Sequence, residues 1–227
     1  MTEKTEKWVA EQLEKEKKFV KEKLEQTARL DYKQKYKVST LILFFFTFAI
    51  FGWVWEVGLH IVQYGEFVNR GTLWGPWLPI YGVGGVIALI FFRKFFDKPV
   101  LTFFLVTIGA SVIEYFTSWL IEYTNGVRFW DYSNYPLNIN GRICLEGSVM
   151  FGLGGCAVIY FAAPFLARYY TKIPAYIKLI ICVLLIGSFM GDLAYTNVNP
   201  HVGAGITDAD WEKTPEGQMA VEKRLKN

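Results

Sequence analysis

Five long apolar runs, separated by short polar stretches, occupy the middle of the chain. They cover about Val38–Val62, Trp74–Phe92, Pro99–Tyr123, Gly147–Ala167 and Ile173–Leu193. A helix needs about 20 apolar residues to cross the hydrocarbon core of a bilayer, and each run reaches or approaches that length. The pattern predicts an all-α, polytopic membrane protein with a transmembrane domain of about five helices over residues 38–193.

The second run differs from the others because prolines and glycines interrupt its first half. Pro76 and Pro79 precede Gly82, Gly84 and Gly85. Non-helical backbone at membrane depth is tolerated only where protein covers it or where it lines a cavity. We therefore expect this helix to begin inside the bundle and to face its centre.

Charged and polar segments flank the apolar runs. Residues 1–37 hold eleven Lys/Arg and eight Asp/Glu, and apolar residues recur among them near helical spacing. This pattern predicts a cytoplasmic amphipathic helix that lies on anionic lipid, packs on a partner or stands free. Residues 194–227 are polar and mixed in charge, which predicts a peripheral tail.

The distribution of Lys and Arg predicts how the chain is oriented in the plasma membrane. If the N-terminus is cytoplasmic, seventeen of the 24 Lys/Arg lie on the cytoplasmic side and seven on the other. Positive residues gather in the cytoplasmic connections of membrane proteins. The count therefore places the N-terminus in the cytoplasm and the C-terminus outside.

Composition supports a membrane protein, and the absence of known motifs limits the kinds of metal, nucleotide and hydrolase site to expect. The 227 residues are 52% hydrophobic, and a net charge of +3 gives no indication of a nucleic-acid partner. The three cysteines have no metal-ligand spacing. The chain also has no GxxxxGK loop, no histidine pair at metal spacing and no GxSxG elbow. We expect no metal and no cofactor, and the sequence leaves enzyme activity open while favouring a protein that is not an enzyme.

Unusual polar residues gather near the predicted outer ends of the helices. The first run carries Glu56, with His60 and Gln63 on the same helical face. The third run carries a stripe at three- and four-residue steps: Thr107, Ser111, Glu114, Ser118 and Glu122. A carboxylate at membrane depth costs about 2.5–3.5 kcal/mol on insertion scales, so it normally faces a cavity or pairs with a cation.

The longest polar connection, Arg128–Glu146, lies at the same predicted level. With Arg70 from the connection before it, Arg128 and Arg142 are candidate partners for Glu56 and Glu114. One interpretation is structural: the ion pairs hold the loops onto the helices. The other is an outward-facing polar pocket, in which arginines bind an anionic or zwitterionic ligand.

Several motifs resemble a bacterial family, the putative ABC-transporter type IV or CmpB-like permeases. The likeness covers about residues 40–170 and rests on GWVWEV (52–57), FVNRGTLWGPWLPIYGVG (67–84) and the stretch from Glu114 to Ser148, which contains WDYS and NINGRIC. Leu78 stands where the family pattern has a cysteine. The resemblance implies which residues carry the family pattern. Among them, the residues that we expect to bind a ligand are Glu56, Asn69, Arg70, Tyr81, Glu114, Trp130, Asp131, Tyr132, Asn140 and Arg142.

Three functions follow from the residues and the resemblance together. The first is a permease or transporter-like protein in contact with membrane lipid, which would need a separate ATPase subunit because the chain has no nucleotide-binding motif. The second is a membrane enzyme that acts on a lipid or envelope head group, with Glu56 or Glu114 as the base. The third is a scaffold protein whose polar cluster only locks the fold.

Overall fold

A computed structural model describes residues 8, 9, 11–19, 30–203, 205–207, 215, 218, 219 and 222. Within this part of the chain the fold is all-α, as predicted, and β-structure is limited to an isolated bridge between Ile139 and Ile143. The α-helices are α2 (Val38–Tyr64), α3 (Pro79–Phe91), α4 (Pro99–Asn125), α5 (Leu145–Ala157), α6 (Ala163–Tyr170) and α7 (Ala175–Val198). A short 3-10 helix (Arg93–Phe95) follows α3, and a π-helical turn (Val158–Ala162) joins α5 to α6.

Four of the described helical segments are long and apolar enough to cross a membrane. They are α2, α4, the continuous segment Leu145–Tyr170 and α7. The π-helical turn within Leu145–Tyr170 lies just before Pro164, which has no N–H to donate to the carbonyl four residues earlier. The segments confirm a multi-pass α-helical membrane protein, and their number is close to the predicted count of about five.

The fifth helix, α3, is shorter than the apolar run that predicted it. It has 13 residues, a length of about 20 Å against about 30 Å for a hydrocarbon core. Helix formation begins only at Pro79, which suits the first helical turn because proline lacks an N–H. α3 contacts α2, α4, α5 and the π-helical turn, so it lies inside the bundle, as the sequence predicted.

Glycines allow the inner helices to approach each other closely. A Cβ on Gly82 of α3 would lie 2.5 Å from the Phe45 carbonyl oxygen of α2. On α5, a Cβ on Gly152 would collide with Thr107 of α4, whereas Gly154 has open space beside it. Small residues with this role are common where membrane helices pack.

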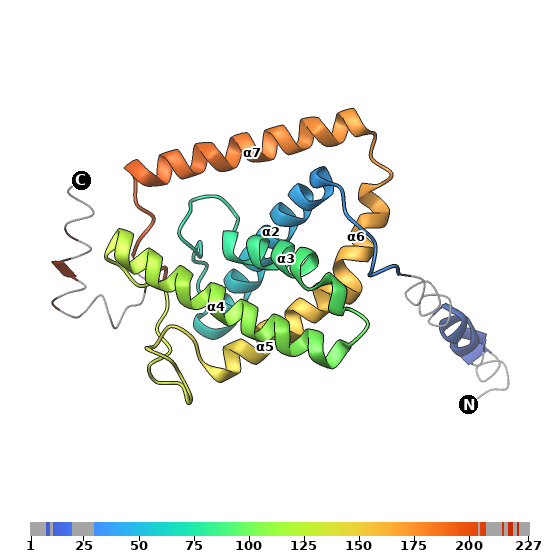
Figure 1. Cartoon of the computed structure of the whole chain (residues 1–227), viewed down its shortest axis with the longest axis horizontal. Helices are drawn as coiled ribbons and strands as arrows, with labels where there is room; N and C mark the ends of the chain where they lie inside the picture. The colour runs from blue at the N-terminus through green and yellow to red at the C-terminus, as the bar shows by residue number, and fades with distance from the viewer. Residues whose placement is uncertain are drawn as a thin grey trace.

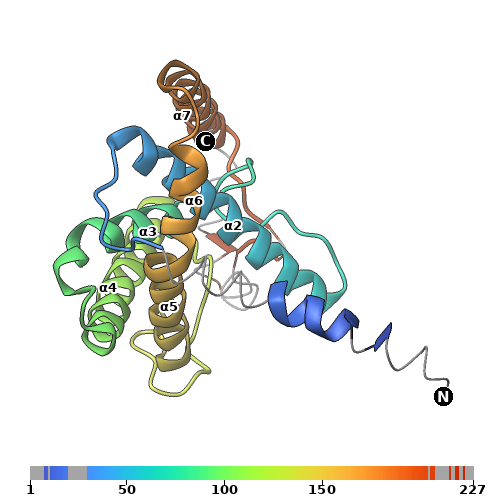
Figure 2. The ribbon, with the colours of Figure 1, turned by 90° about the vertical axis from the view of Figure 1, so that its right-hand side faces the viewer.

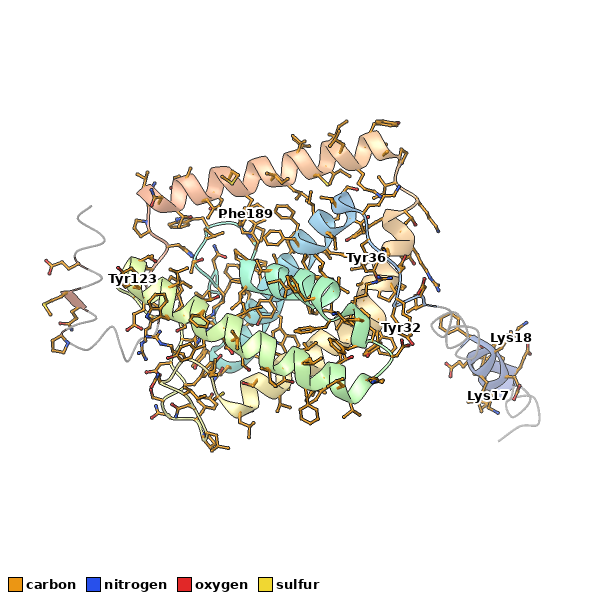
Figure 3. All side chains as sticks on the ribbon, viewed as in Figure 1. Lys17, Lys18, Tyr32, Tyr36, Tyr123 and Phe189 are labelled. Carbon is orange, nitrogen blue, oxygen red and sulfur yellow. The ribbon has the colours of Figure 1, made fainter. Side chains whose placement is uncertain are left out.

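The two ends of the bundle differ in their polar residues. α2, α4 and α7 run in one direction and α3 and α5–α6 run back (Figure 1). We call one end the basic end; here Lys33 pairs with Asp97, and Arg93 donates to the Lys33 carbonyl. The opposite end, which we call the loop end, carries the connections 65–78 and 126–144. Figure 3 labels Tyr32 and Tyr36 at the basic end and Tyr123 at the loop end.

Helix α7 lies at the edge of the bundle and packs on α2 (Figures 1 and 2). Its Phe189 ring meets the rings of Phe46 and Trp77, with centroid distances of 5.9 and 5.8 Å. Figure 3 shows Phe189 between α7 and the rest of the bundle. Much of the remaining apolar surface of α7 is exposed, as expected for a helix that faces lipid.

The flanking segments are described in part. Residues 8, 9 and 11–19 are helical and carry exposed Trp8, Leu13 and Phe19, while residues 30–37 are not helical. Residues 1–7, 10 and 20–29 of the predicted amphipathic helix lie outside the described residues. At the other end of the chain, α7 continues to Val198, five residues into the segment predicted as a tail.

Candidate functional site

The polar stripe of the third apolar run lies on α4 and faces α5 and the 126–144 loop. Ser111 Oγ donates to Ser148 Oγ of α5 at 2.8 Å. Toward the loop end, Ser118 and Glu122 accept hydrogen bonds from the guanidinium of Arg142. The three- and four-residue spacing puts these side chains on one helical face, and the stripe forms the seam between α4 and the loop.

Two of the three candidate arginines pair with Glu122. Arg142 Nη2 lies 2.5 Å from Glu122 Oε2, and Arg128 Nε lies 3.2 Å from Oε1. Arg128 also pairs with Asp131 at 3.6 Å. The sequence offered Glu56 and Glu114 as partners of these arginines, and the structure pairs them with Glu122 instead. The pairs hold the 126–144 loop on the end of α4.

A glycine closes this loop. Gly141 has a φ of +67°, and a Cβ there would collide with Asp131 and come within 2.5 Å of Ser133 Oγ. Its carbonyl accepts from the backbone N–H of Tyr132 at 2.7 Å. Trp130 Nε1 donates to the Arg142 carbonyl at 3.0 Å. Glycine tolerates both the left-handed φ and the close approach, and the turn aims Tyr132 back at α4.

Glu114 is the most deeply placed carboxylate of α4, and 3% of its surface is exposed. Its Oε1 accepts a hydrogen bond from Tyr132 Oη at 3.2 Å. Its Oε2 is buried without a hydrogen-bond partner. None of the ion pairs among the described residues involves Glu114. Tyr36 Oη and Arg128 Nε are also buried without a hydrogen-bond partner among the described residues, and Glu114 is the carboxylate of that set. A buried polar atom without a partner keeps its full desolvation cost.

Glu56 approaches the same region from α2. Tyr81 Oη of α3 donates to Glu56 Oε1 at 2.8 Å, and Arg70 Nη2 lies 3.7 Å from Oε2. The Tyr81 ring rests on Gly52: a Cβ on this glycine would lie 2.5 Å from Tyr81 Cδ2 and 2.9 Å from its Cβ. Gly52 therefore provides the space from which Tyr81 reaches Glu56, one helical turn further along α2.

Four of these residues, Glu56, Tyr81, Glu114 and Tyr132, form what we call the carboxylate cluster. Burial, followed by the negative charges of Glu114 and Glu56, raises the pKa of Tyr132, so this phenol stays a hydrogen-bond donor at neutral pH. Tyr81 interacts electrostatically with the same two carboxylates and with Tyr132. The four side chains come from α2, α3, α4 and the 126–144 loop, and they meet toward the loop end.

Comparison with protein families identifies the chain. The model of the family described as "Putative ABC-transporter type IV" matches residues 43–197. The chain belongs to this family. No curated protein and no solved structure matches it. The family and the apolar helices fit a multi-pass, transporter-like membrane protein in a lipid environment, with a separate ATPase as the partner that the family suggests.

The remaining expected site residues of this family member anchor the two loops of the loop end. Asn69 accepts from Trp53 Nε1 at 2.6 Å and donates to the Trp74 carbonyl at 2.7 Å. At the other loop, Asn140 donates to Tyr115 Oη at 2.9 Å. Asn69 therefore links the 65–78 connection to α2, and Asn140 links the 126–144 loop to α4. Trp130, Asp131 and Arg142 fold or hold the 126–144 loop, as described above.

Residues outside the expected ligand-binding set also shape the loop end. Asp192 of α7 accepts from the N–H of Gly75 at 2.8 Å and from Trp77 Nε1 at 2.7 Å, so α7 anchors the connection before α3. After α7, the buried His201 ring lies 2.8 Å from the Gly71 carbonyl through Nδ1, and Arg70 donates to the Gly205 carbonyl. The position of Asp192 near the end of an apolar run indicated its role. No sequence pattern indicated the docking of His201.

Proposed function

We propose that the protein is a transporter-like permease that binds a zwitterionic solute at the carboxylate cluster. The observation that carries the proposal is Glu114, a carboxylate on a membrane-spanning helix with one buried oxygen that has no partner. Ionisable groups at membrane depth commonly mark the path of a substrate or ion. A cationic group of the solute would supply the partner that Glu114 Oε2 lacks.

Of the anionic and zwitterionic ligands that the sequence suggested, the arrangement of charges favours the zwitterion. Arg142 is hydrogen-bonded to Glu122, and Arg128 is ion-paired with both Glu122 and Asp131, so both are poor receptors for a free anion. Arg70 differs, because its 3.7 Å separation from Glu56 is longer than a hydrogen bond and the acceptor that it does bond is a neutral one, the Gly205 carbonyl. We assign the cationic end of the solute to Glu114 and its anionic end to Arg70.

The proposal includes an orientation and a partner. With the N-terminus cytoplasmic, the loop end and the carboxylate cluster face outward. A separate ATPase subunit would then meet the basic end, where the connection between α6 and α7 is only Thr171–Pro174. The helical residues 11–19, with exposed Leu13 and Phe19 among their charges, are the described segment best suited to contact it.

A thermal-unfolding assay tests the solute site. Purified protein in detergent is heated with glycine betaine, phosphocholine and phosphoethanolamine, and with a neutral polyol and an inorganic anion for comparison. A ligand at 100 times its Kd stabilises the folded state by about 2.7 kcal/mol. We expect at least one zwitterion to raise the unfolding temperature of the wild type, and neither comparison compound to do so.

Two variants locate the binding. Glu114→Gln should abolish the rise in unfolding temperature, and Glu66→Gln, at an exposed carboxylate of the 65–78 connection, should retain it. An equal rise in the Glu114→Gln protein would contradict the assignment of the cationic group. Stabilisation by the inorganic anion alone would show that the ligand is an anion and that the arginines, despite their pairs, receive it.

The scaffold interpretation is supported for another part of the loop end. Glu122 has two arginine partners, and together they tie the 126–144 loop to α4. Such a pair fixes geometry without a ligand. This explanation does not extend to Glu114, because a residue kept only to lock the fold would be expected to have both carboxylate oxygens bonded.

A further inference from the structure

We propose that Glu114 is also the site at which the protein binds and releases a coupling proton, in exchange for the cationic group of the solute. The inference rests on the proposed function for the exchange, but the presence of the proton can be tested without any solute. It starts from the atoms around Glu114 Oε2, where the described residues offer neither a donor nor a cation. A proton on this oxygen removes the charge that the surroundings leave uncompensated.

The groups that face Glu114 favour its neutral form over an isolated anion. From the 126–144 loop, Tyr132 donates one hydrogen bond to Oε1, and Cys144 lies near enough to act on Tyr132. From α2, Glu56 adds a second negative charge, and Tyr81 of α3 gives its hydrogen to Glu56. Like charges that share a low-dielectric site disfavour the state in which both are ionised.

The arginines that the structure describes in the two connections of the loop end all have other partners. Arg70 pairs with Glu56, and both Arg128 and Arg142 pair with Glu122. From α5, the residue that bonds the α4 stripe is Ser148, a neutral hydroxyl. Glu114 therefore differs from the other two carboxylates, because each of them keeps an arginine.

Tyr132 offers a route for the proton. Its hydroxyl touches Glu114, and its neighbour Ser133 is exposed at the loop end. In the transfer, the Tyr132 hydroxyl gives its proton to Glu114 Oε1 and takes another from water at the loop end; rotation of the carboxyl group then places the O–H at the Oε2 position. Release reverses these steps, so only O–H bonds form and break. When the cationic group of the solute arrives, it replaces the proton at the same oxygen, so that one positive charge leaves as another enters.

Infrared difference spectroscopy detects the proton directly. The full-length protein in lipid nanodiscs is stepped between acid and alkaline pH, and the carbonyl stretch of protonated carboxyl groups is recorded in H₂O and D₂O. We expect the wild type to show a carboxylic-acid band, shifted in D₂O, that persists at neutral pH. The band should be lost in Glu114→Gln and kept in the control Glu66→Gln.

A third variant distinguishes a specific band from a folding defect. Tyr132→Phe removes the hydrogen bond to Glu114 Oε1, so the same band should remain and move to higher wavenumber, because a free carbonyl is stiffer than a bonded one. Wild-type and Glu114→Gln difference spectra that superimpose would overturn the proposal, as would a band that Tyr132→Phe leaves at its original position.

The spectra also separate this proposal from the proposed function. A zwitterion that stabilises the protein through Glu114, with no carboxylic-acid band at neutral pH, would leave solute binding intact and remove the proton. A band that is lost in Glu114→Gln but does not change when any zwitterion of the panel is added would support the proton on Glu114 and contradict its exchange for a solute.

Discussion

Replacement of Gly52 by alanine should displace Tyr81 and loosen the carboxylate cluster without removing any polar group. The added Cβ would lie 2.5 Å from Tyr81 Cδ2, well inside contact distance, and the Tyr81 backbone is fixed by α3. Either the tyrosine ring or the whole of α3 must move. The hydroxyl that donates to Glu56 at 2.8 Å moves with it.

A second glycine of α2 provides the matched control. Gly58 lies in the same helix, and a Cβ on it would meet nothing within 4 Å. Alanine is favoured over glycine in a helix by about 0.5–1 kcal/mol, so Gly58→Ala should stabilise the protein slightly. Gly52→Ala gains the same stabilisation from helix propensity, but overpacking against Tyr81 destabilises it by about 1–3 kcal/mol. The two variants should therefore differ by about 1–3 kcal/mol, with Gly52→Ala the less stable.

Reversible unfolding in mixed micelles measures the difference, and a double-mutant cycle assigns it. If the overpacking acts on the Tyr81 ring, Gly52→Ala should be milder in a Tyr81→Ala background, where the ring contacts are lost and only the Cβ of residue 81, at 2.9 Å, still meets the new Cβ. Equal stabilities of the Gly52→Ala and Gly58→Ala proteins, within about 0.5 kcal/mol, would refute the contact between α2 and Tyr81. An unchanged penalty in the Tyr81→Ala background would show that atoms other than the ring receive the clash.

Three further predictions concern the topology and packing of the bundle. In cells, a cysteine at Ser133 should react with an impermeant thiol reagent and one at Asp97 should not, in a background in which the native cysteines are replaced; the reverse pattern would invert the proposed orientation. Asp192→Ala should lower the free energy of unfolding by about 2–4 kcal/mol, because it leaves several donors of the 74–77 stretch unsatisfied, and Asp192→Asn, which keeps one acceptor, should cost less in the same unfolding titration. Gly152→Ala should destabilise the protein by about 1–3 kcal/mol relative to Gly154→Ala, and similar unfolding midpoints would exclude the tight contact with α4.

Periodicity was enough to predict which polar residues share a face. The steps from Ser111 to Glu122 indicated one stripe on a helix, and in the structure this stripe meets α5 and the 126–144 loop. The apolar runs likewise predicted the spans to within a few residues. α3 is the exception: hydropathy extended it back to Trp74, whereas the backbone becomes helical only at Pro79. Hydropathy gives the length of an apolar run. Where the helix begins within the run depends on the prolines and on which backbone N–H and C=O groups can form helical hydrogen bonds.

Arg70 pairs with Glu56, a partner that the sequence offered, but the partner of Arg128 and Arg142 could not be predicted, and helix geometry explains why. Glu122 lies eight residues beyond Glu114 on α4, about 12 Å nearer the loop end. Arginines that arrive from the 126–144 loop meet Glu122 first. Pattern and charge give the face and approximate depth of a carboxylate, but they do not say which of several long side chains reaches it. The docking of His201 against Gly71 was also beyond the sequence, because no periodic pattern links a coil segment to its contact.

Compensation of the carboxylates of α2 and α4 decreases with depth, and this order supports the proposal that Glu114 receives an exchangeable proton or cation. Glu122, at the end of α4, has two arginines; Glu56 has a tyrosine and one arginine at 3.7 Å; Glu114 has a tyrosine alone. If stability alone governed the loop end, the deepest carboxylate would have the best partners, because its desolvation cost is highest. The observed order is the reverse. A group that must exchange a proton or a cation cannot be permanently paired with an arginine, so the missing partner of Glu114 is what an exchange site requires.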